Sequence, residues 1–306
     1  MASLDGPQLR TALGWLARFH ATWWGGGVGA AAAAAARAAG GVAPVGGYWH
    51  LGWRRADVAD LPGHLDRLAA AAPAVADALY GPRLAAAAGR TLLHGDAKAA
   101  NLAWAPDRAS AVAALDFQYV GWGRGVCDVA NLLVSSATPA ALGGALPLPP
   151  AAAAAAAPAT AAGGDSGGAA VAVPRGPPRN PAPLAPPTPT FLSGTADAGG
   201  DRDRVAAAEA SLLGVYTAEL AAALPAGTPP PSADAVATAY ELALLDVVRY
   251  RGTAASVGGR GSAFFGPNAG YALARVGEVL DRLDGGAVAP PGVYAAAIER
   301  LYGHAL

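Results

Sequence analysis

Residues 92–102, Leu-Leu-His-Gly-Asp-Ala-Lys-Ala-Ala-Asn-Leu, form the stretch that decides the fold. Apolar residues stand at both ends of it, which is typical of a tight loop between two short strands. Asp96 and Asn101 lie five residues apart on this loop, with Lys98 between them. A carboxylate and an amide at this spacing bring two oxygen-bearing side chains together, one suited to act as a general base and one as a metal ligand.

A second apolar run, residues 112–115, ends at Asp116, and Asp128 follows twelve residues later. Asp116 can supply another oxygen for a hard cation such as Mg²⁺, which prefers one or two carboxylates plus substrate phosphates. The set suits phosphoryl transfer, which needs positioning, charge neutralisation by a metal and a base for the attacking hydroxyl. Gly95 and Asp96 alone would favour an ordinary turn, so the interpretation depends on the combined spacing.

The order of these residues resembles the catalytic and metal-binding loops of the protein-kinase-like fold. His-Gly-Asp at 94–96 and Asp-Phe-Gln at 116–118 look like its small-molecule branch, which includes aminoglycoside phosphotransferases and choline kinases. Asp-Phe-Gln-Tyr-Val-Gly at 116–121, followed by Asp-Val-Ala at 128–130, is most similar to the ecdysteroid-kinase-like (CHK) group. Residues 16–24, Leu-Ala-Arg-Phe-His-Ala-Thr-Trp-Trp, look like the first large-lobe helix of that group.

The resemblance implies an ATP-dependent phosphotransferase that uses Mg²⁺ and acts on a hydroxyl group of a small molecule. Asp96 would be the base that accepts or orients the hydroxyl proton. Asn101 and Asp116 would hold Mg²⁺. Lys98, the only lysine of the chain, would face the transferred phosphoryl group. The alternative, an accidental surface lysine, is weaker in a chain that otherwise uses arginine.

His94 and Asp128 would support the catalytic loop without touching substrate, with Asp128 accepting hydrogen bonds from the loop backbone. The residues that bind the acceptor are unknown from the sequence. In this fold class the C-terminal helices line the acceptor pocket, which makes candidates of Asp246, Arg249, Tyr250, Arg251, Phe264 and Phe265.

The fold class that the pattern predicts is mainly α with a few short β-strands, and the resemblance implies the large (C-terminal) lobe of a kinase-like protein. Apolar residues repeat at helical spacing over 8–24, 61–79, 126–135 and three segments of the C-terminal third, at 212–220, 236–247 and 273–283. Pro73 is expected to kink or split the second of these helices. Short strands are expected at 92–93, 102–104 and 112–115.

Three regions follow from these patterns. Residues 1–137 form the first part of the lobe and carry both functional loops, and residues 201–306 add its C-terminal helices. Residues 138–200 are an Ala/Pro/Gly insertion that lacks the apolar residues needed to order itself. The alternative for this insertion is a translated intron in the gene model.

The small, strand-rich lobe that precedes a large lobe of this kind is expected to be absent. The glycine-rich residues 25–29 follow the first large-lobe helix, which is the wrong order for a nucleotide lid, and the only lysine already lies in the catalytic loop. Two hypotheses therefore stay open. The chain is a phosphotransferase, weakened by the missing lobe, or it is a pseudokinase or truncated fragment that binds without turnover.

Charge and cysteine content exclude several other classes. A net charge of −1 gives no basic surface for nucleic acid or an anionic membrane. The single cysteine, Cys127, excludes an intrachain disulfide and favours a reducing compartment, so we expect a cytoplasmic protein. The uncharged residues 129–164 are broken by prolines, and no transmembrane helix is expected. The oligomeric state is unknown.

The remaining histidines and the N-terminal tryptophans are expected to be structural. The histidines lack the spacing of metal ligands, so no zinc site is predicted; they are His20, His50, His64 and His304. The tryptophans are read as core residues; they are Trp15, Trp23, Trp24, Trp49 and Trp53.

Overall fold

The computed structural model describes residues 3–26, 35, 38, 41–81, 89–144, 198–257 and 268–305. Most of the predicted insertion at 138–200 therefore lies outside the described residues, as do Phe264 and Phe265.

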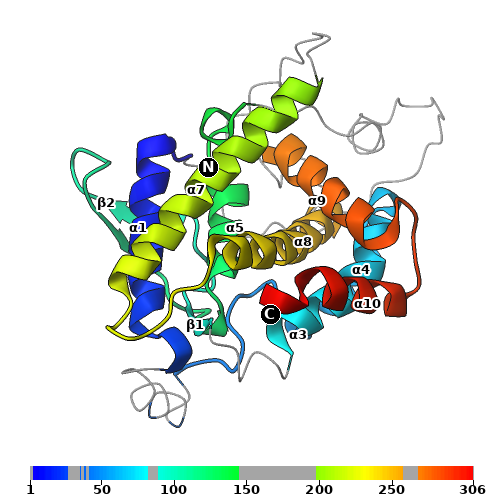
Figure 1. Cartoon of the computed structure of the whole chain (residues 1–306), viewed down its shortest axis with the longest axis horizontal. Coiled ribbons are helices and arrows are strands. Elements are labelled where there is room, and N and C mark those ends of the chain that lie inside the picture. The colour runs from blue at the N-terminus through cyan, green and yellow to red at the C-terminus, as the bar shows by residue number, and fades with distance from the viewer. Residues whose placement is uncertain are drawn as a thin grey trace, which may run out of the picture.

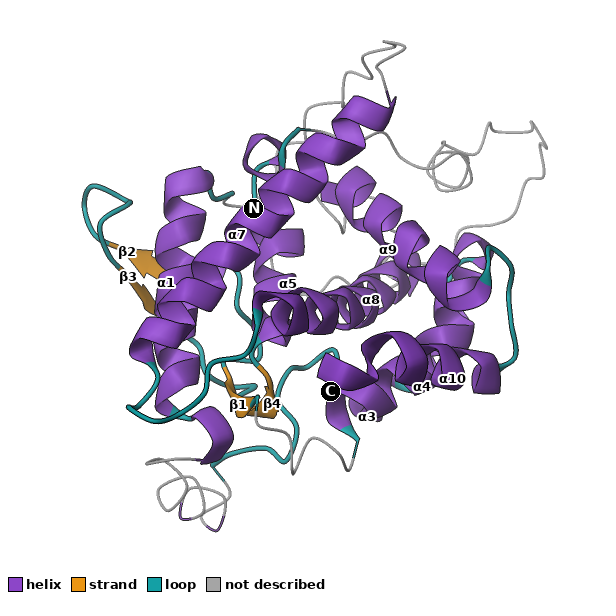
Figure 2. Ribbon diagram, viewed as in Figure 1, coloured by secondary structure: helices purple, strands orange, loops and turns teal. Residues whose placement is uncertain are grey.

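The described part of the chain is mainly helical (Figures 1 and 2). Its α-helices are α1 (Gly6–Thr22), α3 (Leu51–Arg54), α4 (Asp66–Tyr80), α5 (Val126–Ser136), α7 (Ala198–Ala223), α8 (Ala233–Val257), α9 (Ala269–Asp284) and α10 (Pro291–Tyr302). Short 3-10 turns are η1 (Trp24–Gly26), η2 (Ala56–Asp60), η3 (Gly63–Leu65), η5 (Ala99–Asn101), η6 (Pro139–Leu142) and η8 (Gly303–Ala305). The strands are β1 (Arg90–Leu93), β2 (Leu102–Trp104), β3 (Val112–Ala114) and β4 (Gly121–Arg124).

Helix α8 lies at the centre of the molecule, with α5, α4 and α9 packed against it (Figure 1). Leu244, Leu245 and Val248 of α8 and Leu132 and Leu133 of α5 are fully buried, because their apolar side chains leave water for the common core. Helix α7 runs along α1 on one side, and α10 covers α4 on the other. The core thus holds α5 rigidly in place beside the functional loops.

The strands form two separate antiparallel pairs, β1 with β4 and β2 with β3. Leu93 lies opposite Gly121 in the first pair, and Leu102 lies opposite Ala114 in the second. The expected short strands are present, so the prediction of a mainly α protein with a few short strands is confirmed. Strand β4 was not expected, because glycine is depleted in strands. Gly123 leaves room there for the side chain of Leu93, which packs where a Cβ at position 123 would stand.

Of the kink or split expected at Pro73, the split does not occur, because α4 is one helix from Asp66 to Tyr80 with Pro73 inside it. Pro73 lies on the exposed side of α4, where water can satisfy the carbonyl that loses its hydrogen bond. Leu68, Val75 and Leu79 on the other side are buried. The packed face therefore continues past the proline.

Residues Gly200–Ala223 of α7 are long and apolar enough, by length and composition, to cross a membrane. Core helices of folded proteins pass the same test. In this structure Leu212, Tyr216 and Leu220 of this segment are buried, and the helix packs along α1. The sequence interpretation considered residues 129–164 and missed this segment.

Cys127 is fully buried, and burial raises the pKa of its thiol to about 12. Because the thiolate is the reactive form, we expect the folded protein to resist a thiol reagent such as DTNB at pH 8. The same protein in urea should react fully within minutes. Rapid labelling of the folded protein would contradict the buried position of this residue.

Candidate active site

The predicted catalytic loop, residues 94–101, begins with a turn that requires glycine at position 95. Gly95 lies two residues after the end of β1, and its φ is +81°. A Cβ on Gly95 would also collide with the backbone carbonyl of Tyr119, and it would stand 2.9 Å from the amide of Gly47. The turn therefore presses the loop against two other segments and directs the following residue, Asp96, into the interior.

Asp96 is 2% exposed, and its two carboxylate oxygens have different surroundings. Oδ2 accepts from Lys98 Nζ at 2.6 Å and from Asn101 Nδ2 at 3.1 Å. Asn101 Nδ2 also donates to the Asp96 carbonyl at 3.0 Å. Oδ1 is buried and has no partner among the described residues. One oxygen is thus held by two donors, while the other keeps unused capacity to accept a hydrogen bond or a proton.

His94 connects the two functional loops. Its Nδ1 accepts from the Asp96 amide at 3.2 Å, so Nε2 carries the proton and donates to the Leu115 carbonyl at 2.9 Å. Leu115 directly precedes Asp116, and its own amide donates to the Asn101 carbonyl at 2.8 Å. The two predicted metal ligands therefore lie at the same end of the β2–β3 hairpin.

Asp116 is exposed and adopts a φ of +63°, which is unusual for a residue other than glycine. Gln118 donates to its Oδ2 at 3.3 Å. Asn101 turns its Nδ2 toward Asp96, so its amide oxygen is directed elsewhere. A carboxylate and an amide oxygen are hard donors that fit Mg²⁺. No group of three or more His, Cys, Asp or Glu side chains suited to a metal occurs in the described ranges.

Helix α5 holds the loop from behind through Asp128, which is fully buried. Its Oδ2 accepts from the His94 amide at 2.6 Å, and its Oδ1 accepts from the Gly95 amide at 3.0 Å. These are the backbone hydrogen bonds expected of Asp128, although the roles of the six predicted residues stay predictions. The carboxylate satisfies two buried amides that would otherwise carry a large desolvation cost.

Two further residues of α5 hold the loop, and the sequence interpretation missed both. Asn131 Nδ2 donates to the Ala97 carbonyl at 3.0 Å, and Ser136 Oγ accepts from the Ala99 amide at 2.8 Å. Polar residues on an otherwise apolar, fully buried helix were the signal available in the sequence.

His20 was read as a packing or surface residue, but the structure places it next to Asp128. Its Nε2 lies 3.2 Å from Asp128 Oδ2, and its Nδ1 lies 2.9 Å from the hydroxyl of Tyr216. Because a carboxylate only accepts, Nε2 donates to Asp128 and Nδ1 accepts from Tyr216. His20 and Tyr216 are both buried, so this chain of hydrogen bonds is shielded from water.

An aromatic surface lies beside the catalytic loop, where Gly47 and Tyr119 contact Gly95. The Tyr48 ring lies 4.9 Å from the ring of Tyr119 and 5.0 Å from that of Tyr250. Burial raises the pKa of Tyr48, and the carboxylate of Asp96 raises it further, which places Asp96 within electrostatic reach. Sequence reasoning missed Tyr48 because residues 41–50 have no clear periodicity.

The candidate acceptor residues separate into two groups. Tyr250 belongs to the aromatic surface, and Arg251 lies within electrostatic reach of both Asp96 and Tyr48. Asp246 and Arg249 are instead buried and paired at 2.8 Å, with Tyr80 donating to Asp246 at 3.0 Å. That pair is part of the core and out of reach of an acceptor.

Trp53 corrects another expectation, because it is 59% exposed rather than a core residue. Its ring lies 6.4 Å from that of Tyr119, so it extends the aromatic surface toward solvent. Trp49, four residues earlier, is buried as expected.

The comparison with known families gives a match to a family of phosphotransferases. Residues 3–147 match the phosphotransferase enzyme family, APH. The match covers a little under half of the chain and contains all six predicted site residues. Comparisons with curated proteins and with solved structures gave no match. The APH match supports a phosphotransferase of the kinase-like type, in agreement with the arrangement around Asp96.

Proposed function

We propose that this protein is an ATP-dependent phosphotransferase of the ecdysteroid-kinase-like (CHK) type, built on a kinase-like large lobe, that phosphorylates a hydroxyl group of a small molecule. The observation that carries the proposal is the asymmetry of Asp96, with Oδ2 held by two donors and Oδ1 buried without a partner in the described part of the chain. The APH match over residues 3–147 supports the same reaction class.

In this mechanism the Asp96 carboxylate accepts the proton of the acceptor hydroxyl while the hydroxyl oxygen attacks the terminal phosphoryl group of ATP and ADP leaves. Asn101 and Asp116 would hold Mg²⁺, which supplies charge neutralisation on the phosphates when bound. Lys98 pairs with Asp96 at 2.6 Å and is about one-third exposed, so it can also turn its ammonium group to a transferred phosphoryl group. The hydrogen bonds that His94 and α5 make with the loop hold Asp96 in position for this role.

The aromatic surface supports an acceptor with an apolar ring or chain. Tyr48 and Tyr250, two rings of this surface, lie within electrostatic reach of Asp96. Trp53 and Tyr119 extend the same cluster of rings, and ring faces of this kind bind planar apolar groups. The guanidinium of Arg54 already lies over the Tyr250 ring at 5.4 Å. A cationic acceptor would therefore meet like charge, and an uncharged or acidic one is favoured.

The metal part of the proposal predicts a strong effect of Asp116→Asn. We expect this change to raise the Mg²⁺ concentration needed for half-maximal ADP release at least tenfold, because one anionic ligand is lost. The assay incubates the purified chain with ATP, Mg²⁺ and a panel of apolar small-molecule alcohols. The exposed Asp203→Asn is the matched control and should behave like the unchanged protein.

Two outcomes would contradict the proposal. An unchanged Mg²⁺ dependence in Asp116→Asn would remove Asp116 from the metal site. Calorimetric binding of ATP with no ADP release for any acceptor would instead support the second hypothesis, a binding protein without turnover.

A further inference from the structure

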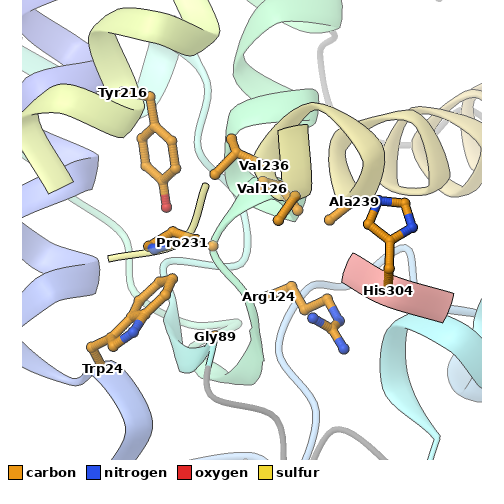
Figure 3. Close-up of a pocket in the computed structure, with 11 residues that line it drawn as sticks. Trp24, Gly89, Arg124, Val126, Tyr216, Pro231, Val236, Ala239 and His304 are labelled. Atoms are coloured by element: carbon orange, nitrogen blue, oxygen red, sulfur yellow. The ribbon is translucent and has the colours of Figure 1, made fainter. Parts of the chain in front are cut away.

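A cavity of about 260 Å³ lies away from the candidate active site. Strand β1 runs from Arg90 into the catalytic loop, whereas the cavity adjoins Arg124, which pairs with Arg90 at the opposite end of the sheet. Its walls are largely apolar (Figure 3). They include Trp24, Val126, Pro231, Val236 and Ala239. None of these residues has a role in the mechanism above.

The cavity also presents positive charge. Arg124 is 6% exposed, and its guanidinium borders the cavity (Figure 3). Burial lowers the pKa of Arg124, because desolvation penalises the cation, and an anion in the cavity would offset this penalty. A guanidinium has five N–H donors, so Arg124 can meet a ligand carboxylate in addition to its other contacts. Gly125 and Val126, at the start of α5, form part of the wall and add the positive end of a helix dipole.

The cavity is linked to the catalytic loop by buried hydrogen bonds. Tyr216 points its hydroxyl toward the cavity (Figure 3) and donates it to His20 Nδ1 at 2.9 Å. His20 in turn contacts Asp128, which holds the amides of His94 and Gly95. The Tyr216 hydroxyl also packs closely against Gly125, because a Cβ on Gly125 would overlap it.

We propose that this cavity is a binding site for a small carboxylate with an apolar ring, and that the chain Tyr216–His20–Asp128 transmits its occupancy to the catalytic loop. Apolar walls and Trp24 suit the ring, and Arg124 together with the start of α5 suits the carboxylate. A bound carboxylate competes with His20 for the Tyr216 proton. His20 then loses its donor at Nδ1, and its hydrogen bond to Asp128 changes with it.

Benzoate and its neutral counterpart benzamide test the site. Titration calorimetry should show benzoate binding at least tenfold more tightly than benzamide, because only benzoate pairs with Arg124. Inorganic phosphate should not bind, since it leaves the apolar walls unfilled. Equal affinities for benzoate and benzamide, or no binding of either, would overturn the proposal.

Two variants fill the cavity without removing a polar group. Ala239→Leu places a larger side chain in it, and Gly89→Ala adds a methyl group 3.6 Å from the Trp24 ring, an ordinary contact. We expect Ala239→Leu to lower benzoate affinity at least tenfold and Gly89→Ala severalfold. Ala222→Leu, on the exposed side of α7, is the matched control and should bind as the unchanged protein does. If Ala239→Leu does not fold, the benzoate affinity of Gly89→Ala decides whether benzoate binds in the cavity. Unchanged binding in the cavity-filling variants would place benzoate elsewhere.

The linkage has its own test, which needs neither ATP nor turnover. Benzoate should shift the amide NMR signals of His94 and Gly95 in the unchanged protein. Tyr216→Phe keeps the ring and removes the hydroxyl, so benzoate should still bind but leave those two signals in place. Shifts of equal size in Tyr216→Phe would overturn the linkage, and failure of phosphoryl transfer would not affect it.

Discussion

We expect Asp96→Asn to reduce the rate of the proposed phosphoryl transfer by about 10²–10⁴-fold, the contribution typical of a general base. The change keeps the size and shape of the side chain, but an amide does not accept the proton of the acceptor hydroxyl. Lys98 loses an ionic partner whose side chain is only 3% exposed, and the amide nitrogen of the new asparagine becomes a buried donor with no acceptor among the described residues, which costs about 1–3 kcal/mol. The expected result is thus a fall in kcat together with a modest fall in the melting temperature.

The measurement is the initial rate of ADP release in the presence of acceptor, with circular dichroism to confirm the fold. Asp60→Asn changes an exposed aspartate of η2 and should retain full activity. A variant that keeps more than about one-tenth of the rate would remove Asp96 from the role of base.

Asp128→Ala has the largest expected effect on stability. The change leaves the amides of His94 and Gly95 and the ring of His20 without their acceptor, all of them buried. Each unsatisfied buried donor costs about 1–3 kcal/mol, so we expect the free energy of unfolding to fall by about 3–5 kcal/mol. Urea denaturation followed by circular dichroism measures this fall.

Asp128→Asn removes the charge of the side chain but keeps its shape. It keeps one carbonyl oxygen as an acceptor but turns an amide group toward a donor, so we expect an intermediate loss of about 1–3 kcal/mol. The exposed Asp203→Ala should change the unfolding free energy by less than about 0.5 kcal/mol. If Asp128→Ala unfolds at the same urea concentration as the unchanged protein, α5 does not hold the loop as described.

The catalytic loop could be predicted because its signals are local. Asp96, Lys98 and Asn101 lie on six consecutive residues, and such short spacing fixes which side chains meet. The helices of the C-terminal third were predictable for the same reason, since their apolar residues repeat every three or four positions. The three regions proposed for the chain stay predictions, because most of residues 138–200 lie outside the described ranges.

The surroundings of the loop were not predictable, because they depend on contacts between distant parts of the chain. His20 and Tyr216 are 196 residues apart, and nothing near either residue indicates the other. The aromatic surface has the same origin, since Tyr48, Tyr119 and Tyr250 come from three separate segments. Trp53 was misread because a tryptophan is usually buried, and only the tertiary structure shows its exposed ring.

Asp116 places function and stability in opposition at a single position. Its left-handed backbone suits glycine, which would adopt φ +63° without the steric cost that aspartate bears. Selection for a more stable fold therefore favours glycine at position 116, whereas the proposed phosphotransferase needs a carboxylate there. A related protein that is no longer selected for catalysis could replace Asp116 with glycine and remove this backbone strain. The residue at position 116 therefore indicates whether a lineage is still selected for the reaction.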